Sequence, residues 1–307
     1  MKTLLKILMP LLVLGVLTAG DEAGGTAGAY LRMPGDARSA AIGNAATAVT
    51  GDANMVNGNP AILPSLTERQ FSSSFQFLTL DRSYQSIAFG VPLPPNAAMN
   101  VSWIHAGVDN IAGRNFSNDY TYEYVWSQNA FVIGFGIRIA EWIAIGVSGK
   151  ILSDQLAYSS SSGFSADIGV IVTPVRHLQL GFVVKDLSGK TTWDTSGENY
   201  SDFQTRRTDY FPGVYHMGIS YMLLERYLLS FSYKYSEDIE PTWHTGAEAR
   251  IGDGIFIRAG VDNGIPVFGF GTYYKLWNNM STRMDYAFGT SRVHEGISHL
   301  FTWLFYF

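Results

Sequence analysis

Charged side chains that recur at every second position are the residues of this chain best suited to chemistry. In each segment they share a face with glycine and serine, while the opposite face is apolar. Inside a pore, such charges could select a charged solute, or they could form a structural ladder that solvates an internal segment. The residues are Arg138, Lys150, Asp167, Lys185, Lys234, Glu248, Arg250, Arg258, Asp262, Arg283 and Asp285.

Motifs for catalysis, metals and nucleic acid are missing from the sequence. Six histidines are scattered without a metal-binding spacing, no nucleophile elbow is present, and no helix follows the Gly-x-Gly pairs at Gly134 and Gly269. The chain has no cysteine, which excludes disulfides, thiolate metal sites and a lipid anchor. The net charge of -5 argues against a nucleic-acid partner. We therefore expect a protein without enzymatic activity, metal or cofactor.

In the segments that carry the charges, apolar and polar residues alternate, as in β-strands with one apolar face. Leu229, Phe231 and Tyr233, for example, alternate with Ser230 and Ser232. A single Arg or Lys on the lipid side near mid-membrane would cost about 2 to 4 kcal/mol, so the charged face is assigned to the lumen of a transmembrane barrel. The aromatic share of 14% is typical of a barrel with two aromatic girdles.

Strand count and loop lengths fit such a barrel. About fourteen antiparallel strands fit between residues 68 and 307, at about 17 residues per strand and connection. The two longest predicted connections, 108–125 and 187–212, are both odd-numbered, whereas the even-numbered ones are short. Long outer loops and short periplasmic turns are typical of bacterial barrels. The sequence therefore predicts an all-β membrane protein, a 14-stranded antiparallel transmembrane β-barrel, with 187–212 outside and 174–176 in the periplasm.

The last strand, residues 296–307, carries a separate signal. Phe301, Trp303, Phe305 and Phe307 recur at a period of two, so all four aromatic rings project from one face. A strand that ends on Phe resembles the signal that outer-membrane barrels present to the barrel assembly machinery. We expect this strand to pair with the first one and to face outer-membrane lipid.

The N-terminal part divides into two segments. Residues 1–20 read as a signal peptide, with Lys2 and Lys6 near an apolar run that is too short to span a bilayer. Residues 21–67 are rich in Gly, Ala, Asn and Asp, and 36–42 and 44–49 suggest short helices. Such a segment can turn tightly and satisfy its backbone hydrogen bonds in a polar lumen. We therefore predict that residues 21–67 form a short helical plug on the periplasmic side, and that residues 68–307 form the barrel.

Residues 27–66 resemble the N-terminal signature of the PorV/PorQ family, which is related to the FadL-type outer-membrane barrels. The resemblance is carried by Ala29-Tyr30-Leu31, by the run from Gly35 to Ala45, and by Asn59-Pro60-Ala61. It departs from the usual pattern at Ile42 and at Asn57-Gly58. The matched signature positions are Gly35, Arg38, Gly43, Asp52, Asn59 and Pro60.

The resemblance implies a plugged barrel with a part in type IX secretion, whose partners would be secretion-system subunits and exported cargo proteins. The alternative is a FadL-like channel for hydrophobic small molecules. Aromatic residues in 108–125 and 187–212 could anchor a protein partner. Residues 27–66 offer few large apolar side chains to line a solute pocket. Because the long loops are rich in aromatic residues and the plug is poor in large apolar ones, the sequence favours a part in type IX secretion over a solute channel.

Overall fold

The computed structural model describes residues 26–194, 206–277, 280–290 and 296–307. The predicted signal peptide, residues 1–20, lies outside these described residues. From residue 26 onward, four short helices precede the strands: η2 (Ala29–Arg32), α2 (Ala37–Ala41), η3 (Ala53–Asn57) and η4 (Pro60–Ser65). The strands are β1 (Gln70–Phe77), β2 (Arg82–Leu93), β3 (Ala97–Arg114), β4 (Tyr120–Ala140), β5 (Ile143–Leu156), β6 (Ser159–Val175), β7 (Leu178–Asp194), β8 (Arg206–Tyr210), β9 (Val214–Leu223), β10 (Tyr227–Tyr235), β11 (Thr242–Ile251), β12 (Ile255–Asp262), β13 (Ile265–Trp277), β14 (Met280–Thr290) and β15 (Ile297–Tyr306).

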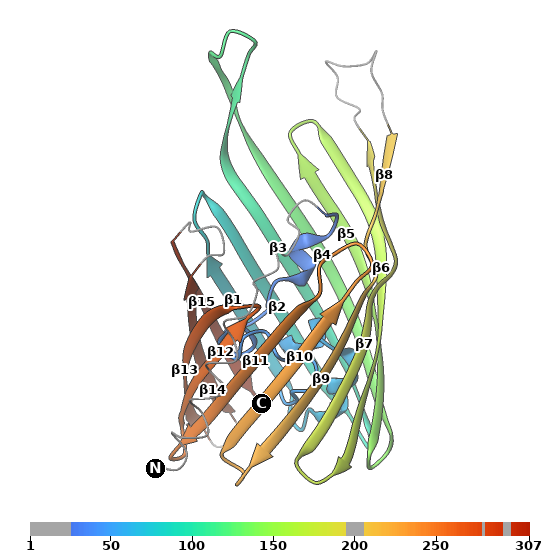
Figure 1. Cartoon of the computed structure of the whole chain (residues 1–307), viewed down its shortest axis with the longest axis vertical. Helices are drawn as coiled ribbons and strands as arrows, with labels where there is room; N and C mark the ends of the chain where they lie inside the picture. The colour runs from blue at the N-terminus through green and yellow to red at the C-terminus, as the bar shows by residue number, and fades with distance from the viewer. Residues whose placement is uncertain (1–25, 195–205, 278–279, 291–295) are drawn as a thin grey trace.

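These strands form one closed antiparallel barrel (Figure 1). β1 pairs with β15, and each other strand pairs with its neighbours in sequence. The exception is β7, whose first half pairs with β9 and whose second half pairs with β8. β8 and β9 are thus two pieces of one strand, interrupted at Phe211-Pro212-Gly213, and the barrel is 14-stranded as predicted.

Strand lengths differ from the prediction at one end of the barrel. The predicted loop 108–125 is mostly strand, because β3 continues to Arg114 and β4 begins at Tyr120. The resulting hairpin extends well beyond the rim formed by the neighbouring strands (Figure 1). Part of 187–212 is likewise strand, in β7 and β8. Cross-strand pairing continues along both strands of each hairpin, from Ala97 to Arg114 against β4 and from Lys190 to Asp194 against β8, so the strands reach further than predicted.

The alternation of each strand places apolar side chains outside and small or polar ones inside. In β4, Phe131, Ile133 and Phe135 are exposed, while Ala130 and Val132 are buried. In β15, Phe301, Trp303 and Phe307 are exposed on the outer wall. Phe305 lies on the same face, 6.4 Å in ring separation from Phe71 of β1. No helix in the described residues is long and apolar enough to cross a membrane.

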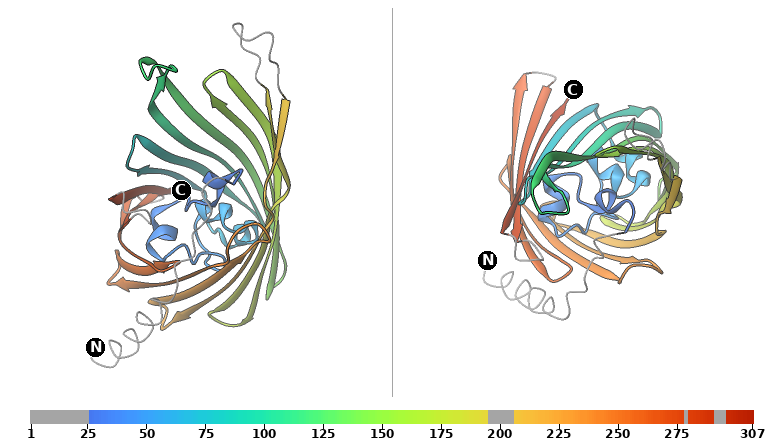
Figure 2. Two further views of the ribbon diagram at one scale, coloured as in Figure 1. Left: turned by 45° about the horizontal axis from the view of Figure 1, so that its top comes forward. Right: turned by 90° about the horizontal axis from the view of Figure 1, so that it is seen from above.

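The segment before β1 lies inside the barrel, where Figure 2 shows it filling the lumen from above. Its apolar side chains Met55, Val56, Ile62 and Leu63 are buried, and they form a core with residues of the inner wall. The core of the molecule therefore sits between plug and barrel. The fold class predicted from the sequence, a barrel with a short helical plug, is confirmed.

Only the first of the two predicted plug helices forms. Asp36 caps α2 by accepting a hydrogen bond from the Ser39 N–H at 2.8 Å. Gly43 and Asn44 then adopt positive φ angles of 67° and 60°, which end the helix. The residues 44–49 that follow are turns rather than a helix, because this stretch packs against the wall at β7 and β9.

Candidate functional site

A cavity of about 530 Å³ lies in the lumen above the plug and is the candidate solute site. The plug contributes Tyr30, Met33 and Pro34 to its lining. The wall contributes apolar side chains from several strands, among them Val108, Trp126, Val214, Ile265, Val267 and Leu300. A concave, largely apolar cavity with a few polar groups is the usual form of a small-molecule site.

Two side chains that line this cavity each have a polar atom without a hydrogen-bond partner among the described residues. The Trp126 Nε1–H and the Gln76 Oε1 are buried and make no hydrogen bond within the described part of the chain. Charged side chains also border the cavity, at Arg32, Lys234 and Asp262. The Trp126 and Gln76 side chains could orient a solute that carries a hydrogen-bond acceptor or donor, because a buried unsatisfied polar group gains by pairing.

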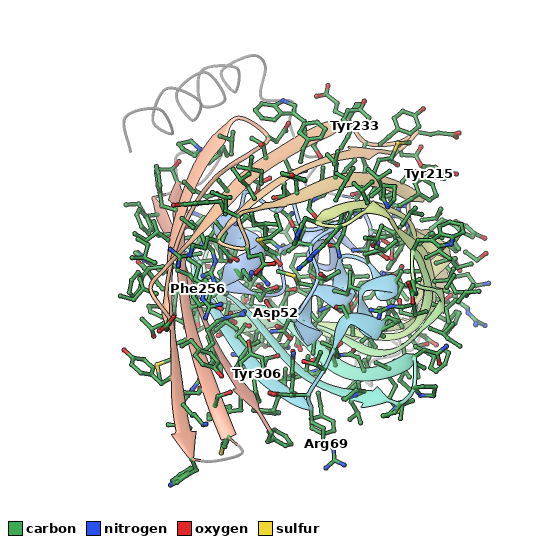
Figure 3. The ribbon with its side chains drawn as sticks, turned by 90° about the horizontal axis from the view of Figure 1, so that it is seen from below. Asp52, Arg69, Tyr215, Tyr233, Phe256 and Tyr306 are labelled. Carbon is green, nitrogen blue, oxygen red and sulfur yellow. The ribbon has the colours of Figure 1, made fainter. Side chains whose placement is uncertain are left out.

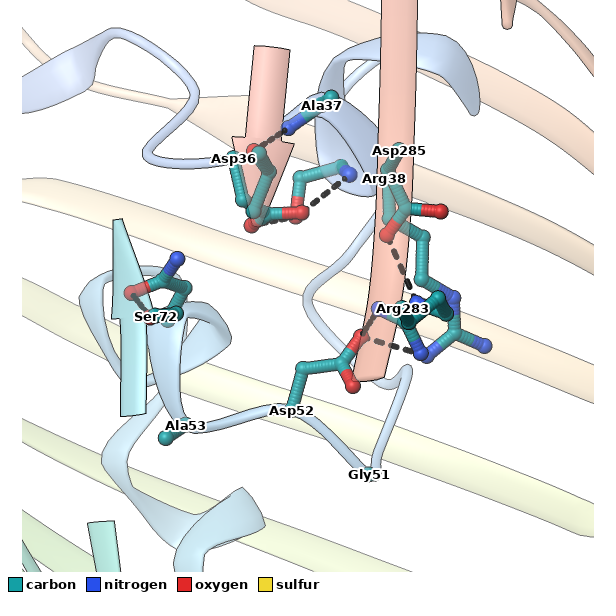
Figure 4. A network of polar contacts seen from close by, with 12 residues as sticks. Asp36, Ala37, Arg38, Gly51, Asp52, Ala53, Ser72, Arg283 and Asp285 are labelled. Atoms are coloured by element: carbon teal, nitrogen blue, oxygen red, sulfur yellow. Dashed lines mark hydrogen bonds and ion pairs between the residues drawn. The ribbon is translucent and has the colours of Figure 1, made fainter. Parts of the chain in front are cut away.

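The floor of the cavity is the plug, and a ring of buried ion pairs fixes the plug to the wall. Arg38 and Asp52 of the plug pair with Glu248 and Arg283 of the wall. Figure 3 shows Asp52 inside the barrel, seen from below. Each of the ring's three arginines contacts two carboxylates, and each carboxylate contacts two arginines. Figure 4 shows the part of the ring around Asp52 and Arg283. The ring runs Arg38–Glu248–Arg258–Asp285–Arg283–Asp52, with nitrogen–oxygen distances of 2.8, 2.6, 2.7, 2.7 and 2.6 Å, and it closes from Asp52 to Arg38 at 2.9 Å.

The ring is electrically balanced, and its members are buried. Burial alone would raise the pKa of Asp52, but Arg283 and Arg38 outweigh it and hold that pKa below its ordinary value. Removal of one partner of a buried pair leaves an uncompensated charge, which costs about 3 to 5 kcal/mol. The ring therefore locks the segment from Arg38 to Asp52 in place.

A second network lies on the inner wall at β5, β6 and β7. The Lys150 Nζ lies 2.7 Å from Asp167 Oδ1 and 2.8 Å from Asp186 Oδ1. Asp186 has a positive φ of 59°, and its backbone N–H donates to Asp167 at 3.0 Å. This network holds the irregular middle of β7, where its pairing passes from β9 to β8.

The remaining predicted charges occupy separate positions. Arg138 and Arg250 are exposed and donate to the backbone carbonyls of Pro64 at 3.1 Å and Asp253 at 3.3 Å. Lys185 is buried beside the plug, and Lys234 and Asp262 border the large cavity. The predicted set thus divides into the ring, the Lys150 network, two rim residues, Lys234 and Asp262 at the large cavity, and Lys185 beside the plug.

The signature residues of the plug have structural roles. Asn59 donates to the Thr47 carbonyl at 2.9 Å and accepts from the Ala61 N–H at 3.0 Å, and Pro60 begins η4. The Gly35 carbonyl accepts from the Ser86 hydroxyl at 2.5 Å. A Cβ at Gly43 would lie 2.5 Å from the backbone oxygens of Thr245 and Val261, so only glycine fits there.

His244 and Asp186 are important residues that the sequence reasoning did not single out. The His244 Nδ1 lies 3.0 Å from the Gly43 carbonyl and 2.7 Å from Asp262 Oδ1. The imidazole of His244 therefore connects the plug to the wall. His244 stands two residues from Gly246 on the inward face of β11. The alternation of inward and outward side chains along β11 is the sequence signal that places His244 in the lumen.

Fold and site define a closed antiparallel β-barrel of 14 strands with an internal plug, an architecture that supports an outer-membrane location. A scan against protein-family models finds no match, and a search of curated proteins finds none either.

Among solved structures, the chain is similar to the CymD monoaromatic hydrocarbon channel, with TM-score 0.61, 14% identity, and 90% of this chain and 97% of that chain covered. It is also similar to the Pseudomonas putida toluene transporter TodX, with TM-score 0.59, 12% identity, and 87% and 96% covered. A Pseudomonas aeruginosa FadL homologue aligns with TM-score 0.60, 11% identity, and 94% and 99% covered. Two of these three are described as a channel or a transporter, and none as an enzyme.

Proposed function

We propose that this protein is an outer-membrane channel for apolar small molecules. The observation that carries the proposal is the cavity of about 530 Å³ that the plug and wall form together. The similar structures described as a hydrocarbon channel and a toluene transporter favour the same function. This reverses the preference for secretion drawn from the sequence.

Most of the apolar lining of the cavity comes from the barrel wall rather than from the plug. The plug does offer few large apolar side chains to the cavity, because Met55, Val56 and Leu63 are used in packing against the wall. Val108, Trp126 and other residues of the inner wall supply the lining instead. A solute that enters from the open end would meet these residues before it reached the plug.

The test is uptake of toluene by cells that produce the full-length protein. Ala106 borders the cavity, so Ala106→Trp should fill part of it and lower uptake several-fold, by overpacking the site. Val101 lies on the same strand but is exposed on the outer wall, so Val101→Trp is the matched control and should leave uptake unchanged. Equal uptake by wild type, by Ala106→Trp and by cells without the protein would contradict the proposal.

A part in type IX secretion is the second candidate, and one observation favours it. Phe116, Tyr120 and Tyr122 are exposed on the long β3–β4 hairpin, where they could anchor an exported protein. Replacing residues 111–123 by a tight turn should then impair cargo export without unfolding the barrel. Normal export by that variant, together with loss of toluene uptake in Ala106→Trp, would support the channel function and exclude the part in secretion.

A further inference from the structure

The inner wall at β4 and β5 holds a buried donor and a buried acceptor that each lack a hydrogen-bond partner among the described residues. Trp126 of β4 lines the large cavity, and the unpaired donor is its Nε1–H. Asp154 of β5 is 5% exposed. Its Oδ2 accepts from the Ser161 hydroxyl at 3.3 Å, whereas its Oδ1 is the unpaired acceptor. Burial of an unpaired polar atom is costly, so both atoms gain from a bound group that pairs with them.

Strand register places these two side chains next to each other. Gln128 of β4 pairs with Asp154, and Trp126 is two residues from Gln128 on the same inward face. Trp126 and Asp154 are therefore diagonal neighbours, with Cα atoms about 7 to 8 Å apart. The Gln128 side chain and the Asn129 N–H lie beside the Asp154 carboxylate, yet neither bonds to Oδ1. An oxygen with a hydrogen bond on either side spans about 5.6 Å, so one bound group can reach both side chains.

The unpaired Oε1 of Gln76, also at the cavity, belongs to a separate position. Gln76 is on β1, three strands from Trp126 on β4, which is about 14 Å at the usual strand spacing. One small group therefore cannot contact both Gln76 and Trp126.

The partner that Trp126 and Asp154 need is a group that accepts and donates at once. The indole offers only a donor, and the carboxylate accepts. A hydroxyl meets both demands, because its oxygen accepts from the Trp126 Nε1–H while its own hydrogen is donated to the Asp154 Oδ1. An ether or a carbonyl can only accept, an ammonium can only donate, and a hydrocarbon does neither.

We propose that the solutes of the channel are apolar molecules with a hydroxyl group, namely phenols or alcohols, and that Trp126 and Asp154 hold that hydroxyl. The apolar body of the solute lies in the large cavity against Val108 and Ala106, which are on β3 beside Trp126 and Gln128. Hydrogen bonds to an ionised acceptor are about twice as strong as neutral ones, so Asp154 contributes most of the preference. This inference rests on the proposed channel function and names its substrate class.

The test compares three ligands of nearly equal shape for binding to the full-length barrel in detergent, measured by calorimetry. p-Xylene has a methyl group where p-cresol has its hydroxyl, and 4-methylanisole has an ether oxygen that only accepts. p-Cresol should bind about 10-fold tighter than either analogue. Trp126→Phe and Asp154→Asn should each weaken p-cresol binding by about 5- to 50-fold and leave p-xylene binding within about twofold of wild type.

Trp103→Phe is the matched control, because Trp103 is on the outward face of β3 and its Nε1–H donates to Asn129 Oδ1 at 3.2 Å. This variant should bind p-cresol as wild type does. Unfolding temperatures separate lost binding from lost folding, since p-cresol should raise that of wild type and of Trp103→Phe more than that of Trp126→Phe.

Equal affinity for p-cresol and p-xylene would overturn the hydroxyl site, and would mean that water satisfies the two atoms. Unchanged p-cresol binding by both Trp126→Phe and Asp154→Asn, or no saturable binding of p-cresol, would overturn it too. Toluene carries no hydroxyl, so its uptake tests the channel function separately.

Discussion

Asp52 of the plug and Arg283 of β14 lie 2.6 Å apart, Oδ2 to Nη2, although 231 residues separate them in the chain. The same Asp52 oxygen lies 2.9 Å from Nη1 of Arg38. One plug carboxylate thus joins the first part of the plug to a strand that is formed near the end of the chain.

Asp52→Asn should destabilise the folded barrel by about 3 to 5 kcal/mol, because Arg283 and Arg38 would each lose a buried partner. The free energy of unfolding is measured by urea titration of the barrel in detergent. Glu225→Gln is the control, since the Arg176–Glu225 pair is exposed and such pairs contribute about 0 to 1 kcal/mol. Equal effects of the two substitutions would show that the ring contributes no special stability.

The stability difference between wild type and Asp52→Asn should shrink in acid. The pKa of Asp52 is lowered on folding, so its contribution is complete well above the unfolded value of 3.8, starts to fall as pH approaches that value, and is lost as pH falls through the folded pKa. Unfolding curves of both proteins between about pH 7 and pH 3 measure the difference, which should begin to decline below about pH 5. A constant difference down to pH 3 is the result that would count against the lowered pKa.

Gly43→Ala should prevent the plug from seating, whereas Gly252→Ala should be tolerated. Both glycines have positive φ, 67° and 60°, and alanine pays about 1 to 2 kcal/mol for that backbone at either site. Only at Gly43 would the new Cβ also meet backbone oxygens at 2.5 Å, while nothing lies within 4 Å of Gly252. Protease cleavage within residues 26–67 reports plug seating. Similar resistance of the two variants would argue against a rigid contact at Gly43.

Tags inserted in residues 115–119 or 187–212 should be reachable from outside intact cells, and tags at 174–176 should not. The β3–β4 and β5–β6 connections and the adjoining ends of β7 and β8 are at one end of the antiparallel barrel, and the β6–β7 turn is at the other. Antibody labelling of whole and of permeabilised cells distinguishes the two ends. Surface labelling at 174–176 would reverse the predicted orientation, with the plug then toward the outside.

Replacing Phe305 and Phe307 by Ser should block assembly and leave a protease-sensitive chain that lacks heat-modifiable migration on gels. These residues lie on the outer face of the closing strand, and the ring of Phe307 stacks 6.2 Å from that of Phe89. The control is Phe231→Ser with Phe270→Ser, which removes two exposed rings from the middle of the wall. If both pairs of substitutions impair folding to the same degree, the C-terminus holds no separate assembly signal.

The sequence alone determined the barrel, because the period of two is a local property. Each strand shows its greasy and polar faces within ten residues, as in Leu229 to Lys234, and the bilayer fixes which face points outward. The sequence did not predict how far β3 and β4 extend, because the length of a strand depends on its pairing with the neighbouring strand.

The sequence also marked the plug and most charges of the lumen, but tertiary structure alone decided their grouping. Glu248 joins the ring and Arg250, two residues later on the same face, reaches the rim, because depth along the barrel depends on register between strands. Likewise Lys150 gained two carboxylates and Lys185 none. Charge type and alternation are written in the chain, whereas distance to a counterion depends on how the plug and fourteen strands meet in space.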